Sequence, residues 1–231
     1  MLSGIVSSSL IVAAVGGVIS LDRTAAFQTM VSRPLVTAPV IGYFLGNAEA
    51  ALIVGAVLEL LLIGDLPVGR YIPVHETGLS VLVTAAALNA TPASFPVEGV
   101  LPTVLLVMIP VSVFYQKADT IVRRINIRFF DNARTMLDNG EEACLMGENL
   151  KGAALFCLTG FVTIFVTALP VMASARYLRP MVEQSAVYPA FAACLVLGVA
   201  AGVNAVYAER TLLIFTAAGI VAAAVWMVGG L

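Results

Sequence analysis

The sequence predicts an all-α, polytopic membrane protein, and two observations support this fold class. First, 60% of the 231 residues are hydrophobic and only 11% are charged, with a mean hydropathy of +1.00. Soluble domains carry about 25% charged residues. Second, apolar runs of about 20 residues, the length that crosses a bilayer as a helix, recur along the chain. The length is that of one domain, and we expect residues 1–231 to form a single membrane unit.

Five apolar runs approach or reach the spanning length. They cover residues 2–21, 99–116, 151–174, 186–207 and 211–230. The first run could be mistaken for a signal peptide, but it lacks a basic leading region and is followed by Asp22 instead of a small-residue cleavage site. We therefore expect it to remain as the first span.

The first half of the chain also contains shorter apolar segments at 35–46, 50–64 and 78–90, separated by polar, Gly or Pro residues. Short interrupted segments are typical of re-entrant or broken helices, because irregular backbone at membrane depth needs protein or water as hydrogen-bond partners. Two or three short full spans joined by tight turns are the alternative. We predict short re-entrant or broken helices in this half.

One long polar segment, at about 117–150, interrupts the apolar pattern. Basic residues in loops favour the cytoplasmic side, and apolar residues in this segment recur at helical spacing. We predict a charged cytoplasmic helical segment, either a docking or lever element or a solvated linker. With Lys151 the segment holds half of the chain's 12 Lys and Arg residues, namely Lys117, Arg123, Arg124, Arg128, Arg134 and Lys151.

Several classes of function find no support in the sequence. The three cysteines fit no zinc or redox spacing and there is one histidine, so we expect no metal and no cofactor. The sequence contains neither a phosphate-binding glycine loop nor a nucleophile placed beside a base, so no catalytic residue is assigned. The net charge of -2, without a basic stripe, indicates no nucleic-acid partner.

Glu59 is the most informative residue. It is the only charged residue in the apolar run 50–63. Placing an ionised carboxylate in hydrocarbon costs roughly 2.5–3.5 kcal/mol on insertion scales, so such a group faces protein, water or a ligand. Glu59 is therefore expected to line a site for a hydrophilic solute. The structural alternative is a hydrogen bond to backbone that a broken helix leaves unpaired.

Other polar residues near Glu59 in the sequence extend this candidate substrate-binding site. Carboxylates and amides can accept hydrogen bonds from neighbouring hydroxyl groups of a sugar. Helix capping or turn chemistry would explain several members equally well, and a solvated loop would explain the His-Glu pair. Arg33 precedes Pro34 and is interpreted as an interfacial anchor. The further candidates are Asp22, Gln28, Asn47, Asp65, His75 and Glu76.

An ordered series of short motifs resembles the membrane IIC component of mannose/fructose/sorbose-family sugar phosphotransferase systems. A weaker match follows at Asp138-Asn139-Gly140, and the chain departs from the family pattern at Ser32, Asn47 and His75. The series consists of Phe27-Gln28, Arg33-Pro34-Leu35, Gly42-x-x-Leu45-Gly46-Asn47, Gly55-x-x-Leu58-Glu59-Leu60 and the stretch from Gly64 to Gly69.

The resemblance implies a multi-pass permease subunit in a bacterial inner membrane that moves a hexose-type sugar by an elevator-like displacement. Its implied partners are a IID membrane subunit and a phosphorylated cytoplasmic IIB subunit supplied by IIA, within an oligomer surrounded by lipid. The subunit itself would carry no phosphorylated residue. Gln28 and Glu59 would be sugar ligands, with Asp22 and Asn47 nearby.

Two other functions remain open at this stage. An ion-coupled secondary transporter would use Glu59 or Asp65 as a proton or sodium site, and discontinuous helices suit that class as well. A diverged, non-transporting member would act as a docking or regulatory scaffold.

Overall fold

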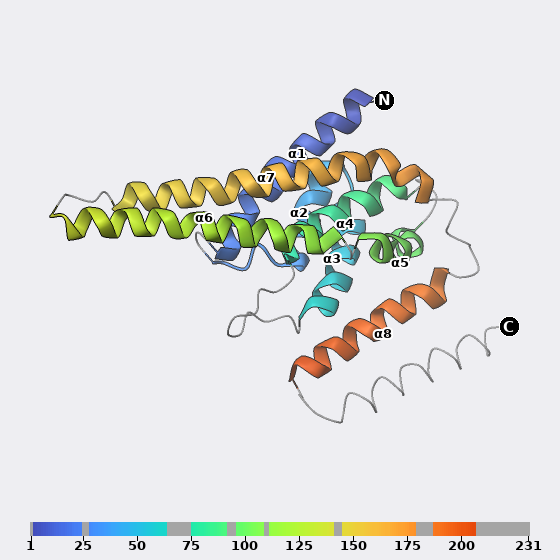
Figure 1. Cartoon of the computed structure of the whole chain (residues 1–231). Helices are drawn as coiled ribbons and strands as arrows, with labels where there is room; N and C mark the ends of the chain where they lie inside the picture. Colours follow the sequence, from blue (N-terminus) through green and yellow to red (C-terminus); the bar gives the residue numbers. More distant parts are fainter. Residues whose placement is uncertain are drawn as a thin grey trace.

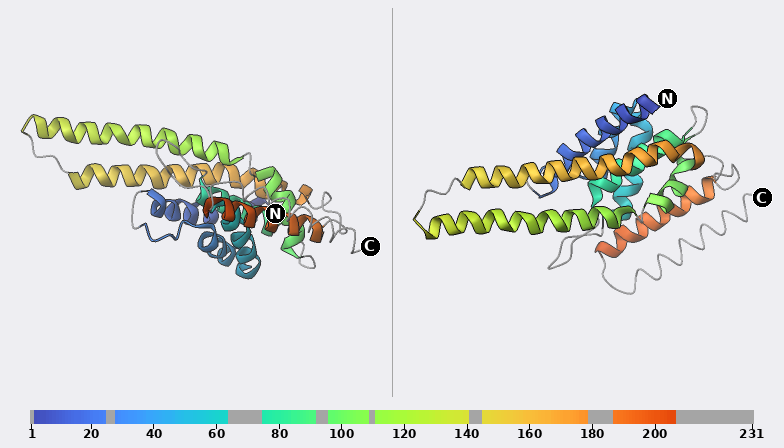
Figure 2. Two further views of the ribbon diagram at one scale, coloured as in Figure 1. Left: turned by 90° about the horizontal axis from the view of Figure 1, so that it is seen from below. Right: turned by 45° about the horizontal axis from the view of Figure 1, so that its top comes forward.

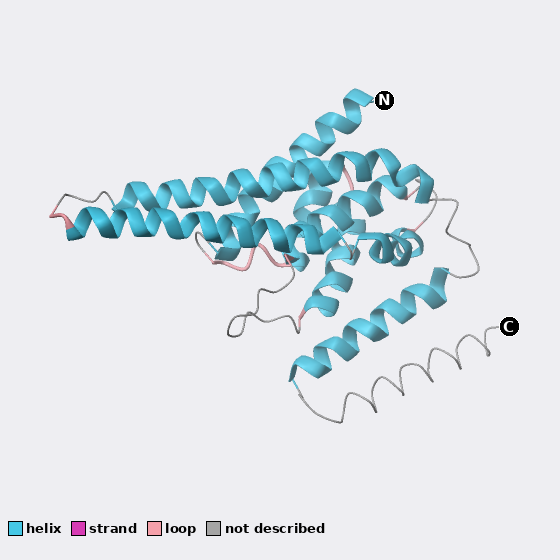
Figure 3. Cartoon of the chain, viewed as in Figure 1, coloured by secondary structure: helices cyan, strands magenta, loops and turns pink. Residues whose placement is uncertain are grey.

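The structure is a computed structural model that describes residues 2–24, 28–63, 75–91, 96–108, 111–140, 145–178 and 187–206. All regular secondary structure in these ranges is helical, as Figure 3 shows, which confirms the predicted fold class. The helices are α1 (Leu2–Thr24), α2 (Pro34–Leu45), α3 (Ala48–Leu62), α4 (Glu76–Ala90), α5 (Val97–Met108), α6 (Ser112–Asp138), α7 (Leu145–Leu178) and α8 (Val187–Val206).

Helix α4 lies at the centre of the helical body and packs against α1, α2, α3, α5 and α7. Twelve of its 15 residues are buried. Most of these residues are small or carry a hydroxyl group, and such residues favour close contact with other helices inside a membrane. Helices α2, α3 and α4 have 12, 15 and 15 residues, and this length confirms short helices in the first half.

Helices α6 and α7 form a long antiparallel pair that extends beyond the helical body (Figures 1 and 2). The predicted helical segment at 117–150 is thus largely helical, but it belongs to two helices separated near 139–144. Several apolar side chains on the outer part of α6 are exposed, including Ile127, Phe130 and Leu137. The cytoplasmic location of this segment remains a prediction.

Two described helices are long and apolar enough to cross a membrane, α1 over Ser3–Arg23 and α7 over Met146–Ser174. They correspond to the predicted spans 2–21 and 151–174. The predicted span at 99–116 falls on α5 and the beginning of α6, which are bent by 52° relative to one another and are long and apolar enough to cross only if the bent pair counts as one span. Helix α8 corresponds to 186–207, whereas 211–230 lies outside the described residues.

A tight turn connects α2 to α3. Gly46 ends α2 in the left-handed region at φ 87°, and the Asn47 side chain accepts a hydrogen bond from the Ala50 amide at 3.0 Å. The two helices then approach closely at Gly55. A Cβ atom at Gly55 would lie 2.6 Å from the Pro34 carbonyl oxygen and 3.0 Å from the Ala38 Cβ. Because glycine has no Cβ, the beginning of α2 can pack directly against α3.

The Gly55→Ala variant tests this close approach. The added methyl group meets backbone that cannot rotate away, and overpacking of this kind costs about 1–3 kcal/mol. We expect a lower thermal unfolding midpoint of the purified protein in detergent. Gly4→Ala is the control, because a Cβ there meets nothing within 4 Å. Equal midpoints for Gly55→Ala and Gly4→Ala would contradict the proposed packing.

Candidate functional site

The carboxylate of Glu59 lies at the beginning of α2. Glu59 follows Gly55 by one helical turn and so shares its face of α3. Its Oε2 accepts a hydrogen bond from the Leu35 amide at 3.3 Å. Leu35 is in the first turn of α2, where amides lack a partner within the helix and the helix dipole favours a negative charge. Glu59 thus caps α2 from another helix, while 21% of its side chain stays exposed.

Arg33 joins Glu59 to Glu76. Its Nη1 lies 3.7 Å from Oε1 of Glu59 and 3.2 Å from Oε2 of Glu76, the first residue of α4. The beginning of α2, the end of α3 and the beginning of α4 therefore meet in an Arg33 cluster, consisting of Arg33, Glu59 and Glu76. One guanidinium faces two carboxylates, so the cluster carries one excess negative charge. All three side chains are partly exposed, with 29% of Arg33, 21% of Glu59 and 12% of Glu76 accessible.

Asp22, near the end of α1, organises the turn that precedes α2. Its Oδ1 accepts hydrogen bonds from the Thr29 amide at 2.6 Å and the Thr29 hydroxyl at 2.7 Å. Its Oδ2 accepts one from the Ser32 amide at 3.2 Å. Thr77 of α4 donates to the Ser32 carbonyl oxygen at 3.1 Å. Gln28 is exposed on the same turn. The turn that Asp22 holds therefore contains Gln28 and leads directly into Arg33.

His75 precedes α4 and faces a different part of the molecule from Glu76. Its Nδ1 accepts a hydrogen bond from the Gly78 amide at 3.0 Å, which requires that nitrogen to be unprotonated. Burial lowers the pKa of His75 to about 4, with the nearby Arg23 guanidinium as the second cause, so the imidazole is neutral at pH 7. Its ring lies 5.9 Å from that of Tyr115, between centroids.

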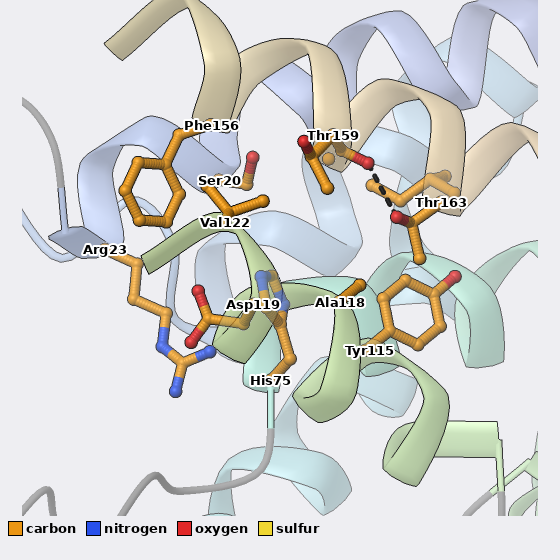
Figure 4. Close-up of a pocket in the computed structure, with 12 residues that line it drawn as sticks. Ser20, Arg23, His75, Tyr115, Ala118, Asp119, Val122, Phe156, Thr159 and Thr163 are labelled. Atoms are coloured by element: carbon orange, nitrogen blue, oxygen red, sulfur yellow. Dashed lines mark hydrogen bonds between the residues drawn. The ribbon is translucent and has the colours of Figure 1, made fainter. Parts of the chain in front are cut away.

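A small cavity of about 20 Å³ lies beside His75, between α1, α4, α6 and α7 (Figure 4). Its polar lining includes Ser20, Arg23, Asp119 and Thr159. Figure 4 shows the Asp119 carboxylate between Arg23 and His75. This volume accommodates about one water molecule and is far too small for a sugar. His75 therefore belongs to a packed polar region beside the Arg33 cluster.

Asn47, one of the candidate residues, is not brought to this cluster. Asn47 caps the other end of α3, 12 residues from Glu59, which corresponds to about 18 Å along a helix axis. It lines a separate pocket of about 310 Å³ together with Glu49 and Glu98. Asp65 lies outside the described residues. In the described part of the chain, no group of three or more His, Cys, Asp or Glu residues is placed to hold a metal ion.

Arg33, Thr29 and Ser32 are the residues that the sequence analysis did not assign to the site. Arg33 was interpreted as an interfacial anchor, but it contacts two carboxylates. A cation at the beginning of a short apolar helix, in a chain with an isolated acid in the next helix, is a signal for such a pair. Thr29 and Ser32 have no comparable signal, because their contribution is mostly through backbone amides.

These features define a helical membrane protein with a polar cluster where three short helices meet. The chain belongs to the EII-Sor family, the sorbose-specific IIC components of phosphotransferase systems, because the model of that family matches residues 6–229. The protein is thus a membrane subunit of the sugar phosphotransferase class.

Two solved structures have a similar fold. One, described as "Structure of membrane protein", has a TM-score of 0.66 and 22% identity, covering 95% of this chain and 86% of the other. The second is described as the mannose transporter ManYZ in complex with microcin E492. It has a TM-score of 0.60 and 21% identity, covering 96% of this chain and 86% of the other. At these identities the likeness concerns the fold alone. Among curated proteins, no relative matches this chain.

The Arg33→Gln variant tests the cluster. It leaves two neighbouring carboxylates without their guanidinium, and because the groups are partly exposed we expect a loss of about 1–2 kcal/mol in unfolding free energy. Glu76→Gln should cost less, since Arg33 keeps Glu59. Arg134→Gln is the control, because the Arg134–Asp138 pair is 73% and 72% exposed. Chemical denaturation of the three variants measures the order, and an equal effect of Arg33→Gln and Arg134→Gln would argue against the cluster.

Proposed function

We propose that this chain is the sugar-translocating subunit of a phosphoenolpyruvate-dependent, mannose-type phosphotransferase system in a bacterial inner membrane. It would work with a IID membrane subunit and a phosphorylated IIB subunit. The observation that carries the proposal is the Arg33 cluster, which contains two partly exposed carboxylates. The chain that carries this cluster belongs to a family of sugar phosphotransferase subunits.

The cluster has suitable chemistry for a neutral hexose. Ionised carboxylates accept several hydrogen bonds, and the amide of Gln28 can both accept and donate. Glu59 and Gln28 are the proposed direct sugar ligands, with Glu76 beside them. Arg33 offsets part of the negative charge, so the site can bind a neutral solute without leaving two uncompensated acids in a partly desolvated position.

The same charge balance provides a reason for product release. Phosphorylation of the sugar by IIB would add about -1.5 to -2 charges. The Arg33 cluster already carries an excess negative charge, so the sugar phosphate would bind more weakly than the sugar. On this proposal the phosphoryl group never resides on this subunit, and the chain contributes binding and movement.

The arrangement of the helices is compatible with movement of the site as a unit. Helices α2, α3 and α4 are short and are connected to one another through the Arg33 cluster. Helix α4 packs against the long α1 and α7, and α2 packs against α1. The α6–α7 pair extends beyond the body (Figure 1), where it would provide a docking or lever element on the cytoplasmic side.

Substitution of Glu59 tests the proposal. We expect Glu59→Gln and Glu59→Ala to abolish sugar uptake. Removing a charged hydrogen-bonding partner from a site costs about 1.5–3 kcal/mol per bond, which is roughly a ten- to hundredfold loss for each bond to the sugar. Membrane insertion should persist. Glu49→Gln is the matched control, since Glu49 lies on the same helix and is exposed at its other end. Normal uptake by both Glu59 variants would refute the role of Glu59.

A reconstitution experiment distinguishes the proposed system from the two alternatives. Vesicles containing this chain and its IID partner should take up and phosphorylate sugar only with phosphoenolpyruvate and the soluble components. Uptake driven by a proton or sodium gradient without them would instead indicate a secondary transporter. Binding of IIB without binding of sugar would indicate a scaffold.

A further inference from the structure

We propose that Asp22 is a positioning residue for sugar recognition and that it does not contact the sugar. Through Thr29 and Ser32 it would hold the turn at residues 28–33, which presents Gln28 and Arg33 to the site. This inference rests on the proposed function, and it assigns to Asp22 a role different from that of a direct ligand.

The contacts of Asp22 point inward to the turn. Asp22 is 7% exposed, and both of its carboxylate oxygens accept hydrogen bonds from residues of the turn. Oδ1 is shared by the amide and the hydroxyl of Thr29, and Oδ2 receives the Ser32 amide. A carboxylate engaged in this way has little remaining capacity for an incoming hydroxyl group.

The backbone of the turn explains why it needs such support. Gln28 has φ 52° and Met30 has φ 65°. Residues other than glycine rarely adopt positive φ, because Cβ approaches the backbone carbonyl oxygen. Two such residues within three positions would relax to an ordinary conformation unless other interactions held them. The three bonds to Asp22 lie between and beside these two residues and provide that restraint.

The turn is connected directly to the proposed sugar ligands. Gln28 belongs to it and is exposed. The Ser32 carbonyl oxygen accepts from Thr77, one residue after Glu76. Arg33 follows Ser32 and reaches both Glu59 and Glu76. A change in the turn would therefore displace the amide of Gln28 and the guanidinium of Arg33 together.

Glycine rescue separates positioning from direct contact. We expect Asp22→Asn to raise the KM for sugar uptake about tenfold or more, because it weakens hydrogen bonds made by a charged group. When Met30→Gly is added to Asp22→Asn, the KM should fall again by several-fold, since glycine adopts positive φ readily. Met30 is 68% exposed, so its side chain contributes little packing.

Two further variants sharpen the experiment. Val31→Gly is the control, because Val31 is the exposed neighbour of Met30 and its φ is not positive. It should give no rescue of Asp22→Asn. Thr29→Val removes one donor to Asp22 and should raise KM by a smaller factor. All values are normalised to the folded, monodisperse complex with the IID partner, so that loss of affinity is distinguished from loss of protein.

Hydrogen exchange provides a readout that does not depend on transport. In the same complex without sugar, Asp22→Asn should accelerate exchange of the Thr29 and Ser32 amides at least tenfold, and Met30→Gly should partly reverse this. Faster exchange in a complex that transports no sugar would refute the proposed function while supporting the role of Asp22 in the turn. Unchanged exchange of these amides in Asp22→Asn would overturn the inference. It would also be overturned if Met30→Gly did not lower the raised KM of Asp22→Asn and Thr29→Val left the KM unchanged.

Discussion

The interaction between Glu59 and the beginning of α2 is the constraint on which the arrangement of the first four helices depends. In an apolar chain, both an isolated carboxylate and the unpaired amides of a helix terminus are costly unless they find partners. The Glu59 carboxylate and the Leu35 amide solve both problems with one contact at 3.3 Å. The contact requires the close approach of α2 and α3, which Gly55 permits.

Arg33 extends this contact to the central helix. Because it also reaches Glu76 at the beginning of α4, three helix ends that are distant in sequence are held in one place. The structural and the functional interpretation of Glu59 are compatible here. A group that caps a helix can still offer a lone pair to a ligand when, as here, part of its side chain is exposed.

Two polar groups of different character thus lie at the same end of the short helices. The Arg33 cluster consists of partly exposed charges, whereas Asp22 is buried and fully engaged with backbone and hydroxyl donors. The bond from Thr77 to the Ser32 carbonyl oxygen joins them. This separation suggests a division between residues that bind solute and residues that hold the binding residues in place. Helix α4, which carries Glu76 and Thr77, packs against the long helices α1 and α7.

Composition and apolar run length alone determined that this is a helical membrane protein, and they located α1, α7 and α8 closely. These are local properties, because transfer of a segment into a bilayer depends on that segment's own residues. Glu59 was also identifiable, since an isolated charge in an apolar run needs a partner wherever it lies. Only the tertiary structure decided which partner it has. Arg33 and Glu76 are 43 positions apart, Asp22 acts on backbone amides seven and ten residues away, and Asn47 lies at the far end of the helix that carries Glu59. Such pairings follow from how helices pack, which no window of sequence contains. The bend between α5 and α6 was not predicted, because the mean hydropathy of a segment does not depend on whether its helix is straight.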